Sequence, residues 1–256
     1  MSMQIGLAGI NAATNDLNTT ANNIANVSTT GFKYSRAEFA DMVSGRCGAA
    51  GVGAGVYTQD VNQLFSQGGI TTTDSGLDFA INGCGFFQVK DDSGTYYTRA
   101  GSFHVDKDGF IVNNLGQKLQ GLKGDLKFTA TDLPITNITL GKDGNISAKS
   151  SAGVEITATN GPLGLAHFPN VNGLKPVGDT NWIETTESGT PNGATKALLA
   201  PGKSGLGLVM NGMLESSNVN LTGQLVNMII AQRNFGANAK TITANSEMAQ
   251  TIIAIR

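Results

Sequence analysis

Two long heptad patterns, one at each end of the chain, constrain the fold more than any other feature. From Met3 to Ile24, uncharged and mostly apolar or small residues recur at alternating steps of four and three, which places them on one face of a helix. The same alternation runs from Leu221 to Ile253. The sequence therefore predicts an N-terminal helix of about 25 residues and a C-terminal helix of about 35 residues, whose faces can pair.

The flanking residues indicate where these helices end. Between Asn26 and Gly31, β-branched and turn-forming residues replace helix formers, and Gly31 can adopt positive φ. Before the C-terminal helix, Ser216, Ser217 and Asn218 are candidate N-caps, because their side-chain oxygens can accept hydrogen bonds from the first unpaired N–H groups. We expect the helices to stop and start at these two places.

Both predicted helices carry unusually few charges. Through Phe32, Asp16 is the only charged residue. Helices that stand alone in water usually display Lys, Glu and Arg, so these segments should fold only when packed. Low charge also lets many copies pack closely without burying unpaired ions. An intramolecular helical hairpin beside a β domain stays open as an alternative, but the missing charge on both helices favours assembly between chains.

The middle of the chain changes to a period of two, which predicts β structure. Asp106–Gly109 and Gly141–Asn145 separate apolar runs and predict two hairpins, because Asp-Gly sequences suit tight turns. Further strands are expected near residues 77–81, 86–89, 95–98, 154–158, 163–167 and 182–185.

These patterns together predict an α+β fold, in which long terminal helices pair as a coiled coil and the middle domain is mainly β. Residues 1–32 and 217–256 would form a terminal helical assembly domain. Residues 33–75 and 200–216 would be an extended connector, and residues 76–199 a β-rich core domain.

Composition argues against several classes of function. Charged residues make up 14% of the 256 residues and the formal net charge is −2, so we expect no nucleic-acid partner. No apolar run approaches the roughly 20 residues that span a bilayer, and the N-terminus lacks the features of a cleavable signal peptide. Cys47 and Cys84 fit no metal or redox spacing, so we expect incidental thiols, whose redox state stays open.

No motif points to catalysis. His104 and His167 are the only histidines, and neither has a second metal ligand at a suitable spacing. Asp106–Gly109 begins like a calcium loop, but Phe110 takes the next alternate ligand position. Gly51–Gly55 lacks the spacing of a dinucleotide or phosphate loop and is interpreted as a flexible connector. We predict no enzyme activity, no cofactor and no metal site.

Several segments resemble known sequence signatures. The N-terminal segment is Ala21–Lys33; the C-terminal segments are Leu214–Leu221 and Leu225–Phe235; the core segments are Leu77–Ile81, Gly85–Phe87 and Tyr97–Phe103. Together they resemble the bacterial flagellar hook and rod proteins, the axial proteins of the hook and basal body. The resemblance extends over nearly the whole chain.

The resemblance implies that terminal helices of many subunits line a hollow tube and that the β domain forms an outer layer. It also implies location in the bacterial flagellum and export through the flagellar type III apparatus. The implied partners are further copies of this chain, neighbouring rod or hook–filament junction proteins, and the hook cap during assembly.

We expect subunit assembly to use the two heptad faces and the N-terminal signature. These residues are Leu7, Ile10, Leu17, Asn22, Asn23, Ile24, Asn26, Gly31, Phe32, Leu221, Leu225, Met228, Ile229, Phe235, Ile242 and Ile253.

The resemblance leaves two members of the family open. Phe39–Met42 and Gly173–Trp182 look hook-like, whereas the chain has no room for a large outer domain between about Asp125 and Pro162 and so has the size of a rod subunit. Met42–Gly55 is shorter than the insertion typical of the distal rod. We favour a short hook protein that transmits torque from rod to filament, with a distal or proximal rod subunit as the alternative. A cell-surface adhesive β protein is a remote third interpretation, because aromatic residues are only 6%.

Overall fold

The computed structural model describes residues 2–44, 52–129, 135–141, 143–150, 154–193 and 197–255. The chain divides into two compact units. The helical unit comprises Met1–Val27, Tyr34–Leu64 and Val219–Arg256, and the β unit comprises Ser28–Lys33 and Phe65–Asn218. A helix at each end and a mainly β middle confirm the predicted α+β class.

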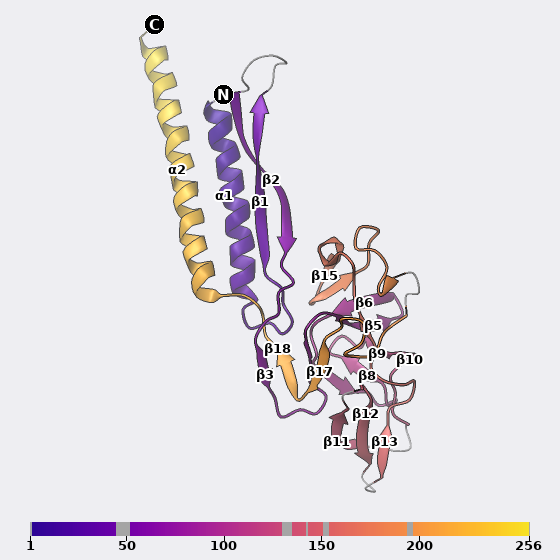
Figure 1. Cartoon of the computed structure of the whole chain (residues 1–256). Coiled ribbons are helices and arrows are strands. Elements are labelled where there is room, and N and C mark those ends of the chain that lie inside the picture. The colour runs from indigo at the N-terminus through magenta and orange to yellow at the C-terminus, as the bar shows by residue number, and fades with distance from the viewer. Residues whose placement is uncertain are drawn as a thin grey trace. The chain divides into compact units, whose positions relative to one another are not determined.

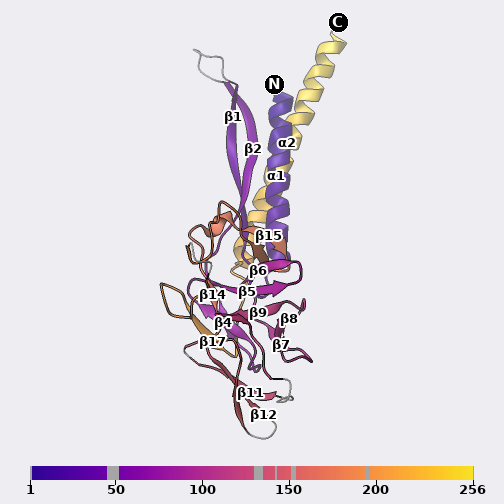
Figure 2. The ribbon, with the colours of Figure 1, turned by 90° about the vertical axis from the view of Figure 1, so that its right-hand side faces the viewer.

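Two helices and a long hairpin form the helical unit. They are α1 (Ser2–Ala25), α2 (Leu221–Ala254), β1 (Ser35–Ser44) and β2 (Val52–Gln63). α1 packs against α2 on one side and against the hairpin on another (Figure 1), and the turned view in Figure 2 again places the hairpin beside α1. The helix lengths of 24 and 34 residues agree with the predicted ones.

Small side chains form the buried face of α1. Ala12 and Ala13 are buried, whereas the larger Leu7 is 54% exposed. A Cβ added to Gly9 would lie 2.6 Å from the Asn238 side chain, so glycine permits the close approach of α2. The helices thus meet in part through small residues beside the heptad face, and the coiled coil stays a prediction.

The N-cap of α2 differs from the predicted one. Asn220 caps the helix, because its side-chain oxygen accepts a hydrogen bond from the Gly223 N–H at 3.2 Å. The cap predicted within residues 216–218 is therefore wrong. Asn218 donates its side-chain amide to the carbonyl and hydroxyl oxygens of Ser66.

The long hairpin lies within residues 33–75, the segment that the sequence analysis interprets as a connector. β1 and β2 pair in antiparallel register, with Met42 opposite Gly55. Within the predicted flexible connector Gly51–Gly55, the residues from Val52 onward belong to β2, and Gly51 lies outside the described residues. Cys47 also lies outside them, whereas Cys84 is an exposed free thiol.

The described part of the β unit contains the remaining strands and the 3-10 helix η2. They are β3 (Ile70–Thr72), β4 (Phe79–Asn82), β5 (Phe86–Asp91), β6 (Gly94–Thr98), β7 (Phe103–Val105), β8 (Ile111–Asn113), β9 (Lys118–Gly121), β10 (Gly124–Asp125), β11 (Ile135–Leu140), β12 (Ile146–Ser150), β13 (Glu155–Thr157), β14 (Leu165–Ala166), η2 (Val171–Gly173), β15 (Lys175–Gly178), β16 (Asn181–Ile183), β17 (Leu208–Asn211) and β18 (Met213–Glu215).

These strands form one large sheet and three small ones. The nine-stranded sheet has the order β15-β16-β6-β5-β9-β8-β7, with β10 on β9 and β14 on β5. β11, β12 and β13 form a second sheet, and β4 pairs with β17 and β3 with β18. The two predicted hairpins are confirmed as β7–β8 and β11–β12; Lys142, in the second turn, lies outside the described residues.

Both faces of the nine-stranded sheet carry buried aromatic residues. Phe86 and Phe87 are neighbours on β5 and therefore point to opposite faces. Phe87 joins a buried cluster with Leu119, and Phe86 joins another with Tyr97 and Trp182. The rings of Phe86 and Trp182 meet edge to face at 5.8 Å between centroids, a favourable aromatic geometry.

A side chain at Gly101 has no space in this packing. A Cβ there would lie 1.6 Å from the carbonyl oxygen of Phe79. We expect Gly101→Ala to lower the free energy of unfolding by about 1–3 kcal/mol or more, because backbone segments must move apart. At Gly94 nothing lies within 4 Å of an added Cβ, so Gly94→Ala is the matched control. Urea denaturation measures both variants, and equal midpoints would contradict the close contact at Gly101.

Candidate functional site

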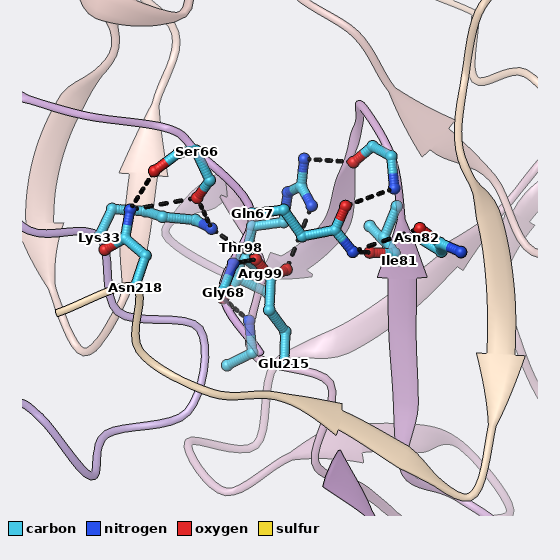
Figure 3. A network of polar contacts seen from close by, with 12 residues as sticks. Lys33, Ser66, Gln67, Gly68, Ile81, Asn82, Thr98, Arg99, Glu215 and Asn218 are labelled. Carbon is cyan, nitrogen blue, oxygen red and sulfur yellow. Dashed lines mark hydrogen bonds and ion pairs between the residues drawn. The ribbon is translucent and has the colours of Figure 1, made fainter. Parts of the chain in front are cut away.

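A buried ionic cluster centres on Glu215, at the end of β18. The Lys33 ammonium lies 2.5 Å from one carboxylate oxygen, Oε1, and donates to the carbonyl of Ser66 at 2.8 Å (Figure 3). The Arg99 guanidinium lies 3.1 Å from the other oxygen, Oε2. The side chains of Lys33 and Glu215 are fully buried, and that of Arg99 nearly so. One carboxylate therefore holds two cations from distant parts of the sequence.

Two glycines bring backbone donors to Glu215. Gly68 N–H donates to Oε1 at 2.9 Å, and Gly31 N–H donates to the main-chain carbonyl of Glu215 at 2.8 Å. Gly31 has φ of +71°, and a Cβ there would lie 2.5 Å from the Ala100 nitrogen. Only glycine fits this position, which gives the predicted assembly residue Gly31 a role inside the β unit.

Arg99 makes further contacts that orient its charge. Its Nη2 donates to the carbonyl of Gly83 at 2.9 Å, and its guanidinium lies 5.3 Å from the centroid of the Phe86 ring. Gly83 N–H in turn donates to Gln67 Oε1 at 3.0 Å. The cluster is thus continuous with the aromatic core through a cation–π contact.

Burial lowers the pKa of the Lys33 ammonium, and the neighbouring Glu215 carboxylate partly offsets this effect. The unfolded chain therefore binds this proton more tightly than the folded chain. As a result, the contribution of Lys33 to stability should rise with pH between its folded pKa and the ordinary value of 10.5. Both Glu215 oxygens are engaged by cations of the same chain, so the arrangement indicates a structural role.

Sequence reasoning missed this cluster, although a signal was present. Lys33, Arg99 and Glu215 are each the only charged residue in a segment that resembles a family signature. A single charge in an otherwise uncharged segment is expected to have a partner when it is buried. Distance along the chain hid that the three charges meet.

α2 leaves most of its apolar side chains exposed. Gln224 and Ala231 are its only buried residues among those described. The α2 apolar surface consists of Leu221, Leu225, Val226, Ile229, Ile230, Phe235, Met248, Ile252 and Ile253. Because burying one such side chain stabilises by about 1.5–3 kcal/mol, a packing partner would stabilise this helix strongly.

The predicted assembly residues differ in burial. Leu7, Asn22, Leu221, Leu225, Ile229, Phe235 and Ile253 are exposed; Ile10, Leu17, Ile24, Asn26, Phe32, Met228 and Ile242 are partly buried; Asn23 and Gly31 are buried. The exposed members leave apolar area for contacts with other chains, and their part in assembly stays a prediction.

Asn23 has a defined role inside the helical unit. Its amide donates to the Ser35 carbonyl at 2.7 Å, and its side-chain oxygen accepts from the Ser35 N–H at 2.9 Å. The same amide lies 3.3 Å from Gln224 Oε1 on α2. Asn23 therefore links α1 to both β1 and α2.

Removing the Glu215 charge should destabilise the protein. Glu215→Gln leaves Lys33 and Arg99 buried without a counter-charge, so we expect a loss of about 3–5 kcal/mol in the free energy of unfolding. Glu38→Gln is the matched control, because it breaks the exposed Arg36–Glu38 pair and should change stability little. Thermal and urea unfolding of the full chain provide the measurement. If both variants lower the free energy of unfolding by the same amount, the buried ion pairs of Glu215 contribute no more than the exposed Arg36–Glu38 pair.

The described residues include no helix that is long and apolar enough to cross a membrane.

Three family models match the sequence. Residues 3–33 match "Flagella basal body rod protein", residues 80–148 match "Flagellar hook protein FlgE/F/G D1 domain", and residues 210–255 match "Flagellar basal body rod FlgEFG protein C-terminal".

Relatives extend the match to the full chain. The flagellar basal-body rod protein FlgG of Bacillus subtilis (strain 168) is 34% identical over 268 residues, which cover 100% of this chain and 98% of that protein. FlgG of Buchnera aphidicola subsp. Schizaphis graminum is 36% identical, with 98% of each chain covered. The flagellar hook protein FlgE of Salmonella typhimurium (strain LT2) is 26% identical over 413 residues, with 100% of each chain covered. The chain therefore belongs to the family of flagellar hook and basal-body rod proteins, whose members are structural subunits of multi-copy axial assemblies.

Proposed function

We propose that this chain is a structural subunit of the flagellar basal-body rod. The end-to-end match to rod proteins carries this proposal, because FlgG relatives align at 34% and 36% identity over 268 residues. The hook relative aligns over 413 residues, so it carries long insertions that this chain lacks. The relatives support the rod alternative better than the hook interpretation that Phe39–Met42 and Gly173–Trp182 favoured.

A hook subunit is the second candidate. The FlgE relative and the D1-domain model, which FlgE shares with FlgF and FlgG, support it. The adhesive interpretation has less support, since it expects exposed aromatic clusters and the only tryptophan, Trp182, is buried.

Assembly would proceed through the terminal segments. Residues 1–32 and 217–256 form the assembly domain in this proposal, with the heptad faces paired as a coiled coil in the inner layer of a tube. Residues 33–75 and 200–216 connect it to the core of residues 76–199. The exposed α2 apolar surface supports this role, because water contact with so many apolar side chains is unfavourable.

The proposed role has consequences for partners. Further copies of this chain would be the main partner, and other rod or hook-junction proteins would meet the ends of the assembly. The chain would travel through the type III export apparatus, and a cap would assist assembly. None of these contacts requires a cofactor or a catalytic group.

Replacing apolar residues of α2 should block assembly and leave the subunit intact. Leu225 and Ile229 are 46% and 51% exposed, so the double change to Gln should leave thermal unfolding of the monomer unchanged. Sedimentation should show about a tenfold or greater loss of polymer, because each buried apolar side chain contributes about 1.5–3 kcal/mol. Leu115→Gln, at a 52% exposed position of the β unit, is the control. Normal polymerisation of the double variant would contradict the role of the α2 apolar surface.

Immunogold labelling of isolated hook–basal bodies distinguishes the two candidates. An antibody against residues 76–199 should label the straight shaft of the basal body. Label along the curved segment outside the cell would instead establish a hook subunit. Absence of label from both would remove the proposed axial role.

A further inference from the structure

Asp16 is a carboxylate without a partner. It lies on α1 and is the only charged residue before Lys33. Its side chain is partly buried, and it forms no hydrogen bond or ion pair with any residue that the structure describes. Burial raises the pKa of its carboxyl group. Partial burial therefore makes the ionised carboxylate less favourable here than in water, and a cation would offset this.

Asp16 lines a groove within the helical unit. The groove has a volume of about 350 Å³, within the range of pockets that bind ligands. Its lining residues come from α1, the hairpin and α2; they are Gly9, Ala12, Ala13, Asp16, Phe39, Val56, Asn234, Ala237 and Asn238. Its walls are apolar or amide-bearing, and Asp16 is the only charge among them. The groove therefore suits a long side chain with an apolar stem and a cationic end.

α2 carries side chains of this kind. Arg233 and Lys240 are the cations of α2, and both are exposed without an ion pair inside the described part of the chain. Arginine fits the groove better, because its stem packs on apolar walls and its guanidinium binds a carboxylate in bidentate geometry. Asn234 lines the groove of its own chain, whereas its neighbour Arg233 does not. Adjacent residues on a helix point in different directions, so Arg233 does not pair with Asp16 of the same chain.

We propose that Arg233 of a second copy of this chain enters the groove and pairs with Asp16. The inference rests on the proposed function, because it needs copies packed through their terminal helices. The contact would set the register between subunits, since charge complementarity selects one alignment among many that apolar surfaces allow.

Charge reversal in separate chains tests the pair. Cells lacking the native chain express Asp16→Arg, Arg233→Asp, or both variants as separate chains, and the amount of chain in isolated hook–basal bodies is measured. Each single variant should lose about tenfold or more of its incorporation, because like charges meet in the groove. Expression of the two variants together should restore incorporation, since each chain supplies what its neighbour lacks. Asp60→Arg, at an exposed position of β2, is the matched control and should incorporate normally.

The outcomes separate this pair from other arrangements. If incorporation is restored only when both changes lie in one chain, the contact does not join two copies. If Lys240→Asp restores incorporation of Asp16→Arg, the partner of Asp16 is not Arg233. Asp16→Asn and Arg233→Gln test the same pair without added charge repulsion; each should lose incorporation while thermal unfolding stays unchanged. If these variants incorporate as well as the native chain does, the Asp16–Arg233 pair is refuted while the proposed function is not. Absence of the native chain from hook–basal bodies would remove the proposed function as well.

Discussion

The burial of the Glu215 carboxylate is the interaction that holds the boundary segments of the β unit together. It joins the segment of residues 28–33, the segment after Phe65 and β18, and each of these lies near a boundary of the unit. Two cations share its charge, so each group needs the others to remain buried. The ends of the unit are thereby fixed to its core by charge-assisted bonds, while the apolar clusters on both faces of the nine-stranded sheet supply most of its stability.

The helical unit follows a different principle. Its internal contacts use small residues such as Ala12 and Ala13, and its large apolar side chains stay exposed on α2. A helix with this pattern gains most of its stability from packing rather than from propensity. In the proposed assembly, packing between copies and folding of the terminal helices are coupled, which would explain why so few charges occur on them.

Periodicity predicted the elements whose signal is long and local. The heptad alternation located α1 and α2, and Asp-Gly turns located the hairpins β7–β8 and β11–β12. The pairs β4–β17 and β3–β18 could not be predicted, because a period of two identifies a strand without identifying a distant partner. The cap at Asn220 was missed because several polar residues precede α2, and only the folded backbone decides which of them meets an unpaired N–H group.

The sequence specifies the assembly surface less closely than the fold, for a related reason. Heptad positions indicate which residues share a helix face, but not whether that face meets the same chain or another copy. Apolar contacts between copies are strong and weakly directional, so they cannot alone select one register. Charged pairs can select one register, because an ion pair between copies forms in one alignment and is lost in the others. The scarcity of charge on α1 and α2 therefore makes each remaining charge more informative, which is why the proposed contact between copies joins Asp16 on α1 to Arg233 on α2.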